Sequence, residues 1–237
     1  MGGDDFPISY YDMDKIKEEF LKYAPAYARK EAAEAIEKVV DLQKQGVLHV
    51  GLYYFVLIDL VGSTKFSTEH GNQKTTERIK YFVRSSFEAL NEIRIKNVSM
   101  FIKEIGDAVL FVFQHFPDFI RWRQAFAESL SFLNPISPEP FVFRTCVHIG
   151  ELDLEGVNPL SLAVSQTFKM EKNVQGGKIV LTEQAYNVAW PTIARAHHGF
   201  EKIGSIDLDG FKEKVNLYEL LVHDDHDLLR ILNEKLE

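Results

Sequence analysis

Two aspartates stand where the chain leaves an apolar segment, and their carboxylates are the first candidates for chemistry. Asp59 follows the apolar run Leu52–Ile58, and Asp107 follows Gly106 between two short β-prone segments. If these segments lie side by side in one sheet, both carboxylates reach the same rim, where they repel each other unless a cation lies between them. Hard oxygen ligands favour Mg²⁺ or Mn²⁺. The pair therefore predicts a metal site, although Asp59 taken alone is better interpreted as a turn residue.

The segment after Asp59 is a candidate phosphate site. A strand that ends in a glycine turn and continues into a helix leaves backbone N–H groups free to point at anionic oxygens. The sequence Leu-Val-Gly-Ser-Thr at residues 60–64 has this character. We therefore predict that the N–H groups of Val61–Thr64 bind phosphate.

Hydrophobic periodicity predicts the elements that position these residues. The nearly continuous apolar run Leu52–Leu60 is typical of a central strand covered on both faces. Helices are predicted over Thr75–Ile95, from Pro117, over Leu160–Val174 and after a cap at Thr182. Further strands are predicted over Val98–Lys103, Ala108–Phe113, Phe141–Ile149, Lys178–Leu181, Ala196–Ile203 and Val215–Leu220.

This order of elements is the split βαββαβ pattern of a ferredoxin-like α+β sandwich. We expect helices on one face of a single sheet, with the other face free to dimerise. A helical arm is predicted ahead of the first strand, capped at Asp14 and divided at Pro25. The expected organisation is an N-terminal helical arm at 1–48, a central domain at 49–222 and a helical tail at 223–237.

The composition excludes several classes of function. The 237 residues carry a formal net charge of −8, which argues against nonspecific nucleic-acid binding. The longest apolar stretch is far shorter than the roughly 20 residues that span a bilayer, and the polar N-terminus predicts no signal peptide. The one cysteine, Cys146, lies in an apolar run and is predicted to pack in the core, which favours a reducing compartment, the cytoplasm.

Taken together in order, several segments resemble the landmarks of class III adenylate and guanylate cyclases. They are FVLIDLVGST, FIKEIGDAVLFVF, FRTCVHIGEL, SLAVSQTFKMEK with GGKIVLTE, and the tail IDLDGFKEKVNLYEL. The resemblance covers about residues 50–221. It implies an enzyme that closes a nucleoside triphosphate into a 3′,5′-cyclic monophosphate with two divalent cations, Mn²⁺ or Mg²⁺.

The resemblance also implies roles for individual residues. Asp59, Asp107 and the backbone carbonyl of Leu60 hold the two metals, which lower the pKa of the ribose 3′-hydroxyl and neutralise charge on the α-phosphate. The β- and γ-phosphates bind to the loop through Val61, Gly62, Ser63 and Thr64. The family's sites lie at a head-to-tail dimer interface, so a homodimer is expected to own two composite sites.

Four positions concern the base, the ribose and the transition state. Lys103 matches the lysine that reads the base in adenylate cyclases. Asn158 stands where the family has an aspartate, and adds an N–H₂ donor beside its acceptor. Ser165 replaces an asparagine that contacts the ribose. Lys169 replaces an arginine and keeps its charge but not its two-pronged geometry. Ordinary helix, strand-end and turn roles remain the alternative for all four.

Three interpretations remain open. With metals retained and the base pocket rebuilt, the chain resembles the bacterial pyrimidine nucleotide cyclases of Pycsar antiphage systems, whose cyclic UMP or cyclic CMP activates a separate effector. Lys103 as a donor suits the two carbonyl oxygens of uracil, which favours UTP, with CTP next. The alternatives are an adenylate or guanylate cyclase, and an inactive relative that binds a nucleotide or a partner. Two close carboxylates favour an active enzyme.

Overall fold

The computed structural model describes residues 51–93, 99–152, 162–193 and 199–221, together with Ala26, Arg29, Lys30 and Ala33. Within these ranges, the side chains of 99–105, Leu152 and 191–193 are not described. The predicted cap at Asp14, the division at Pro25 and the tail at 223–237 lie outside the described residues, so the domain limits stay a prediction. No helix in the described ranges is both long enough and apolar enough to cross a membrane.

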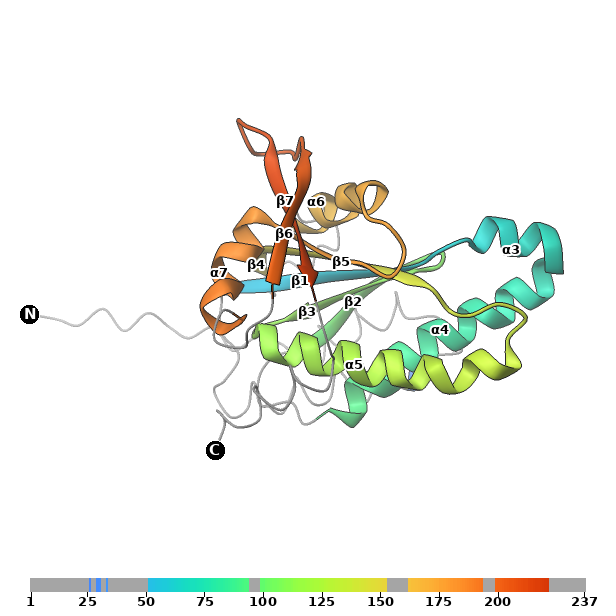
Figure 1. The fold of residues 1–237 in the computed structure, drawn as a ribbon. Helices are drawn as coiled ribbons and strands as arrows, with labels where there is room; N and C mark the ends of the chain where they lie inside the picture. Colours follow the sequence, from blue (N-terminus) through green and yellow to red (C-terminus); the bar gives the residue numbers. More distant parts are fainter. Residues whose placement is uncertain are drawn as a thin grey trace, which may run out of the picture.

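One seven-stranded sheet forms the centre of the described structure (Figure 1). The strand order is β2-β3-β1-β4-β5-β7-β6, and of the paired neighbours only β4 and β5 run parallel. The strands are β1 (Gly51–Leu60), β2 (Ser99–Ile105), β3 (Ala108–Phe113), β4 (Phe143–Leu152), β5 (Ile179–Thr182), β6 (Gly199–Ile206) and β7 (Val215–Leu221).

Helices cover both faces of this sheet, with most on one face (Figure 1). The helices are α3 (Ser63–His70), α4 (Asn72–Glu92), α5 (Phe116–Leu133), α6 (Leu162–Met170) and α7 (Glu183–Ile193). The side chains of α4, α5 and α7 share one buried cluster with Tyr54, Val56 and Ile58 of β1. Those of α6 share a second cluster with Tyr53, Phe55 and Leu57. Because successive strand residues point to opposite sides, α6 lies on the other face.

The α+β fold predicted from the sequence is confirmed, and β1 is buried on both faces as its apolar run indicated. The expectation of helices on one face alone is wrong, because α6 buries Ala163, Val164 and Met170 against the second face. The sequence also missed α3. Gly62 and Gly71 flank this helix with φ of 85°, a backbone conformation in which glycine avoids a steric cost.

Two further expectations about the core are confirmed. Cys146 is a free, fully buried thiol on β4, and burial raises its pKa well above its ordinary value. Thr182 caps α7 through a bond from the Ala185 N–H to the Thr182 hydroxyl at 3.4 Å. The same hydroxyl contacts Nδ1 of the buried His148 at 3.0 Å, so Thr182 joins the sheet to the helix. Burial lowers the pKa of His148 to about 4.

Candidate active site at the rim of the central strands

Asp59 lies at the carboxyl end of β1, between two neighbouring strands. Its cross-strand partners are Ala108 on β3 and Arg144 on β4. Only 7% of the residue is exposed, and this burial raises the pKa of the carboxyl to about 6. A hydrogen bond from Arg144 opposes that rise, while the negative charge of Asp107 adds to it. Asp59 is therefore a buried carboxyl whose ionised form has a high free-energy cost unless a cation lies beside it.

Asp107 lies beside Asp59, in the turn that joins β2 to β3. Gly106 adopts a φ of 64° there, which allows the tight reversal. The Leu60 N–H donates to the backbone carbonyl of Asp107 at 3.2 Å, so this turn is fixed against the end of β1. The fold thus brings together the two carboxylates that the sequence singled out, although they are 48 positions apart in the chain.

Arg144 is the functional side chain that the sequence reasoning missed. Its Nε donates to Oδ2 of Asp59 at 2.8 Å, and its Nη2 forms an ion pair with the same oxygen at 2.8 Å. Its Nη2 also forms an ion pair with Glu171, and its Nη1 donates to the carbonyl of Val174 at 3.3 Å. The one feature of the sequence that could have pointed to Arg144 is its charge inside the segment FRTCVHIG, which is predicted to be a strand. Without the strand register, nothing in the sequence joined it to Asp59.

The turn after Asp59 has the form expected of an anion site, with one correction. Gly62 is the N-cap of α3, and the first N–H groups of a helix have no acceptor within it. The Ser63 hydroxyl donates to the carbonyl of Leu60 at 3.2 Å. The Val61 N–H, however, donates to the carbonyl of Val142 at 2.8 Å. Since this bond uses its one donor, the prediction that Val61 offers an N–H to phosphate is wrong.

The residues predicted to contact the base and ribose are only partly described. Ser165 and Lys169 lie on the exposed side of α6, and Lys169 forms an ion pair with Asp209 at 3.2 Å. Lys103 lies on β2 opposite Leu110, directly after a bulge, but its side chain is outside the described part of the structure. Asn158 also lies outside the described residues. Their roles therefore stay predictions.

Comparison with solved structures identifies the architecture. The adenylyl cyclase CyaB from P. aeruginosa matches with a TM-score of 0.56 at 15% identity, over 75% of this chain and 98% of that one. An adenylate cyclase from Trypanosoma brucei, described in its monomeric state, matches with a TM-score of 0.58 at 15% identity, over 72% and 89%. The non-canonical dimeric guanylyl cyclase domain of a fusion protein from Blastocladiella emersonii matches with a TM-score of 0.53 at 15% identity, over 73% of this chain and 98% of that one.

The chain has the fold of a class III nucleotide cyclase catalytic domain. No protein-family model matches the sequence, and no curated protein matches it. At 15% identity, the likeness to these solved structures shows the fold alone. The chemistry of this chain depends on the residues at the rim of the cyclase fold.

Those rim residues fit a divalent cation. Two carboxylates and a backbone carbonyl make a set of hard oxygen donors, the kind that Mg²⁺ and Mn²⁺ prefer. Burial chiefly raises the pKa of Asp59, and the negative charge of the nearby Asp107 adds to the rise, while Arg144 opposes it. Among the described residues, Arg144 is a cation bonded to Oδ2 of Asp59, so a metal ion would have to share this carboxylate with it or replace it.

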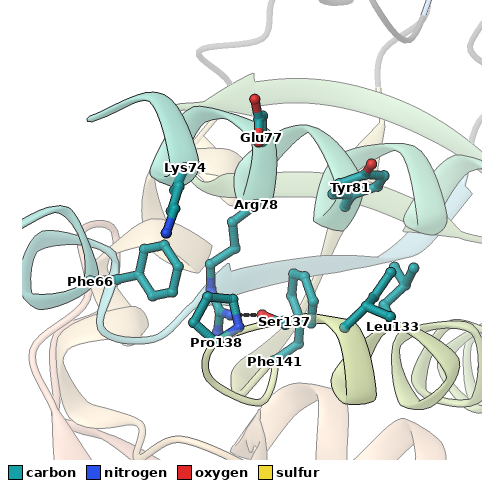
Figure 2. Close-up of a pocket in the computed structure, with 10 residues that line it drawn as sticks. Phe66, Lys74, Glu77, Arg78, Tyr81, Leu133, Ser137, Pro138 and Phe141 are labelled. Carbon is teal, nitrogen blue, oxygen red and sulfur yellow. Dashed lines mark hydrogen bonds between the residues drawn. The ribbon is translucent and has the colours of Figure 1, made fainter. Parts of the chain in front are cut away.

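The cyclase fold of this chain also contains a cavity that is separate from the rim. About 300 Å³ in volume, it lies between α4 and the segment Leu133–Phe141 (Figure 2). Phe66 and Phe141 form apolar walls, and no residue predicted for catalysis lines it. Because none of the predicted metal, phosphate or base-contacting residues lines it, this cavity does not compete with the rim as the candidate site.

Arg78 holds one wall of the cavity in place. Although it is only 5% exposed, its guanidinium donates to the Ser137 hydroxyl at 2.8 Å and to the carbonyls of Glu139 and Pro140 at 2.6 and 2.7 Å. It also lies over the rings of Phe66 and Phe141, at 4.7 and 4.3 Å from their centroids. Arg78 therefore fixes the irregular segment that leads into β4.

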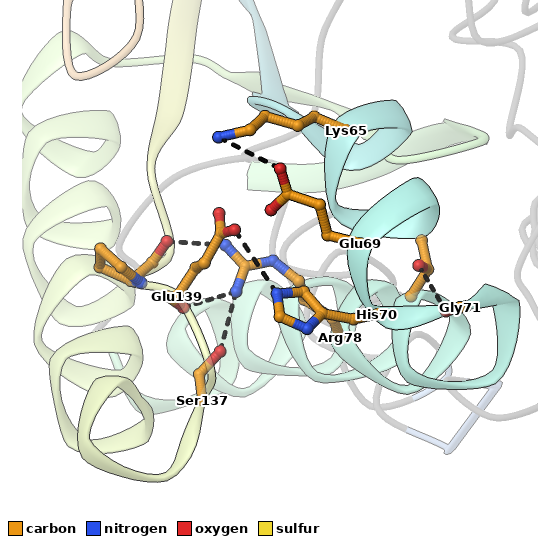
Figure 3. A network of polar contacts seen from close by, with 9 residues as sticks. Lys65, Glu69, His70, Gly71, Arg78, Ser137 and Glu139 are labelled. Atoms are coloured by element: carbon orange, nitrogen blue, oxygen red, sulfur yellow. Dashed lines mark hydrogen bonds and ion pairs between the residues drawn. The ribbon is translucent and has the colours of Figure 1, made fainter.

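A group of Glu69, His70 and Glu139 lies beside Arg78 (Figure 3), and within the described residues it is the grouping of three side chains that could hold a metal ion. Basic side chains already face its carboxylates. Lys65 lies 3.7 Å from Glu69, and His70 lies 3.5 Å from Glu139. The group therefore serves as a polar corner between α3 and the irregular segment leading into β4, and it does not include the predicted ligands Asp59 and Asp107.

Proposed function

We propose that this protein is a nucleotide cyclase that converts a pyrimidine nucleoside triphosphate into its 3′,5′-cyclic monophosphate and pyrophosphate. UTP is the favoured substrate and CTP the next. The observation that carries the proposal is the meeting of Asp59 and Asp107 at one rim, beside the glycine turn that begins α3. The cyclase fold and the solved cyclases that share it support the reaction class.

In the proposed reaction, the ribose 3′-hydroxyl gives its proton to water and its oxygen bonds to the α-phosphorus. The bond from that phosphorus to the bridging oxygen breaks, and pyrophosphate leaves with the released electron pair. Asp59, Asp107 and the Leu60 carbonyl are assigned to two divalent cations, Mn²⁺ or Mg²⁺. Bound there, the cations supply Lewis-acid stabilisation of the charge that develops on oxygen. The N–H groups at Gly62, Ser63 and Thr64 are assigned to the β- and γ-phosphates.

The complete site is assigned to a homodimer. Ser165 and Lys169 lie on the exposed side of α6, where a second copy can be reached, while Asp59 is buried at the rim of its own chain. We assign Ser165 to the ribose, Lys169 to the transition-state phosphate, and Lys103 and Asn158 to the base. Lys169 must then leave Asp209, an ion pair that is weak because both side chains are largely exposed.

Product analysis tests the reaction. Purified protein with Mn²⁺ is incubated separately with ATP, GTP, CTP and UTP, and products are resolved by chromatography and mass. Cyclic UMP or cyclic CMP is expected. Asp59→Asn and Asp107→Asn are expected to abolish turnover, while the exposed α4 control Glu77→Gln retains it. Cyclic AMP or cyclic GMP would reject the pyrimidine assignment, and no cyclic product from folded, metal-bound protein would reject the cyclase.

Complementation tests the dimer. An Asp59→Asn chain and a Lys169→Ala chain are each expected to be inactive, but mixing them restores one intact composite site per heterodimer. Activity that stays absent in a verified heterodimer would contradict shared sites. As a control, mixing Asp59→Asn with Asp107→Asn is expected to restore nothing, because both changes fall in the same half of the site.

The biological role proposed is the signal generator of a cytoplasmic antiphage system that acts through a separate cyclic-nucleotide-activated effector. The unpaired, buried Cys146 suits a reducing compartment. Phage plaque counts on cells carrying the cyclase with its neighbouring effector are expected to fall, and to return to control values with Asp59→Asn. Unchanged plaque counts with an active enzyme would reject the defence role alone.

A further inference from the structure

Arg144 is shared among three acceptors at the rim. Asp59 Oδ2 accepts a hydrogen bond from its Nε and forms an ion pair with its Nη2, Glu171 forms an ion pair with it, and the Val174 carbonyl accepts a bond from its Nη1. The side chains of Arg144 and Glu171 are each 24% exposed, against 10% for Asp59. Arg144 therefore sits as a cation between a buried carboxylate and a more accessible one.

Glu171 is held rigidly enough to position this arginine. It is the first residue of the short 3₁₀ turn Glu171–Asn173, directly after α6. The residues on either side of the turn, Met170 and Val174, are 0% and 3% exposed and belong to the same buried cluster. Because both ends of the turn are anchored in the core, the backbone of Glu171 is fixed at a place from which its carboxylate reaches Arg144.

The charges at the rim favour an exchange of cations. In ionised form, Asp59, Asp107 and Glu171 carry three negative charges and Arg144 one positive charge, which leaves a net charge of −2. One divalent cation neutralises this set. It competes with Arg144 for Asp59, because both are attracted to the same carboxylate. If Arg144 lost Asp59 with no other acceptor, it would be left partly buried and unpaired, at a considerable cost.

We propose that Glu171 is a positioning residue that keeps the Arg144 guanidinium as a removable counter-charge for Asp59. When a divalent cation binds Asp59, Arg144 gives up its bonds to Oδ2 and stays on Glu171 and the Val174 carbonyl. Glu171 thereby lowers the cost of loading the site, and holds a cationic side chain at its edge. This inference rests on the proposed function, in that it takes Asp59 as a metal ligand.

The test measures metal binding, without nucleotide and without turnover. Mn²⁺ is titrated into the full chain and free Mn²⁺ is followed by electron paramagnetic resonance. Glu171→Gln is expected to weaken Mn²⁺ binding about tenfold or more, the usual effect of losing a residue that orients a metal ligand. Glu171→Asp is expected to recover part of the affinity. The matched control is Glu201→Gln, an exposed carboxylate on β6.

A second measurement follows Arg144 itself. In nitrogen–proton spectra, the Arg144 Nε–H signal, assigned with Arg144→Lys, is expected to shift as Mg²⁺ is added, because its bond to Asp59 is lost. In Glu171→Gln the same shift is expected to need about tenfold more Mg²⁺. This readout separates positioning from simple packing, since a packing defect lowers thermal stability without moving the Arg144 transition.

The outcomes separate the two proposals. Metal binding that depends on Asp59 but is equal in wild type and Glu171→Gln overturns the role of Glu171 and leaves the cyclase intact. An Arg144 signal that does not move at saturating Mg²⁺ also overturns it. Metal binding that is unaffected by Asp59→Asn overturns the metal site on which both proposals rest.

Discussion

Replacing Arg78 with alanine is expected to destabilise the protein by about 3 kcal/mol. The change removes three hydrogen bonds from a charged donor, each worth roughly 1.5–3 kcal/mol when made. It also removes the stacking of the guanidinium on Phe66 and Phe141. The recovered hydration of an arginine that is 5% exposed in the fold offsets part of this loss. What remains is a large fraction of the stability of an ordinary domain.

Urea unfolding followed by circular dichroism measures the loss as a lower midpoint at unchanged slope. Lys74→Ala is the matched control, because Lys74 lies one turn earlier on α4, lines the same cavity and is exposed. It is expected to change stability by less than about 0.5 kcal/mol. Arg78→Lys is expected to fall between the two, since an ammonium cannot reach all three acceptors. A loss below about 1 kcal/mol for Arg78→Ala would refute the role of Arg78 in fixing the segment that leads into β4.

Three further predictions concern the packing of α6, the cap of α7 and the charge on Asp59. In Gly150→Ala the new Cβ would lie 2.6 Å from the Cβ of Ala163, so α6 must shift. Thermal melts are expected to show a stability lower by about 1–3 kcal/mol. The Gly150→Ala/Ala163→Gly double variant is expected to recover the lost stability. Thr182→Val removes the hydroxyl that caps α7 and contacts His148. The free energy of unfolding measured by urea titration should fall by about 1–2 kcal/mol. No change would mean that the hydroxyl does not contribute to stability. Folding raises the pKa of Asp59 to about 6, so the protonated carboxyl contributes to the free energy of unfolding below about pH 4, and this contribution is lost as pH rises through 6. In EDTA, the free energy of unfolding of wild type should fall by roughly 3 kcal/mol relative to Asp59→Asn over that range. Parallel curves of stability against pH for the two proteins would contradict the shift.

The elements of the fold could be predicted closely where one local signal dominates. The apolar runs of β1 and β3 predicted strands at the observed positions, because burial on two faces leaves few polar residues. The helix α3 was missed because its eight residues include one buried side chain, Phe66, which is too little for a periodic pattern. Its limits come from two glycines with positive φ, and a sequence does not display φ.

For the candidate site too, the residues marked by local features were predicted correctly in position, and a contact with a distant residue was not. Asp59 and Asp107 were found because each stands beside a strand end and a glycine, which are local features of the chain. Val61 was assigned a phosphate contact because its N–H looked free, but the carbonyl of Val142, 81 positions later, takes that donor. A backbone donor can be counted as free only after every distant acceptor has been placed.

The sequence by itself determined that this chain folds as an α+β domain and that two carboxylates stand at the ends of its central strands, because apolar runs and turn residues act over a few neighbouring positions. Only the tertiary structure decided what surrounds those carboxylates. Arg144 reaches Asp59 across 85 residues because β1 and β4 pair antiparallel in one register, and Glu171 reaches Arg144 because α6 packs on the second face of the sheet. A shift of one residue in that register would turn Arg144 to the other face, and no local pattern in the sequence sets it.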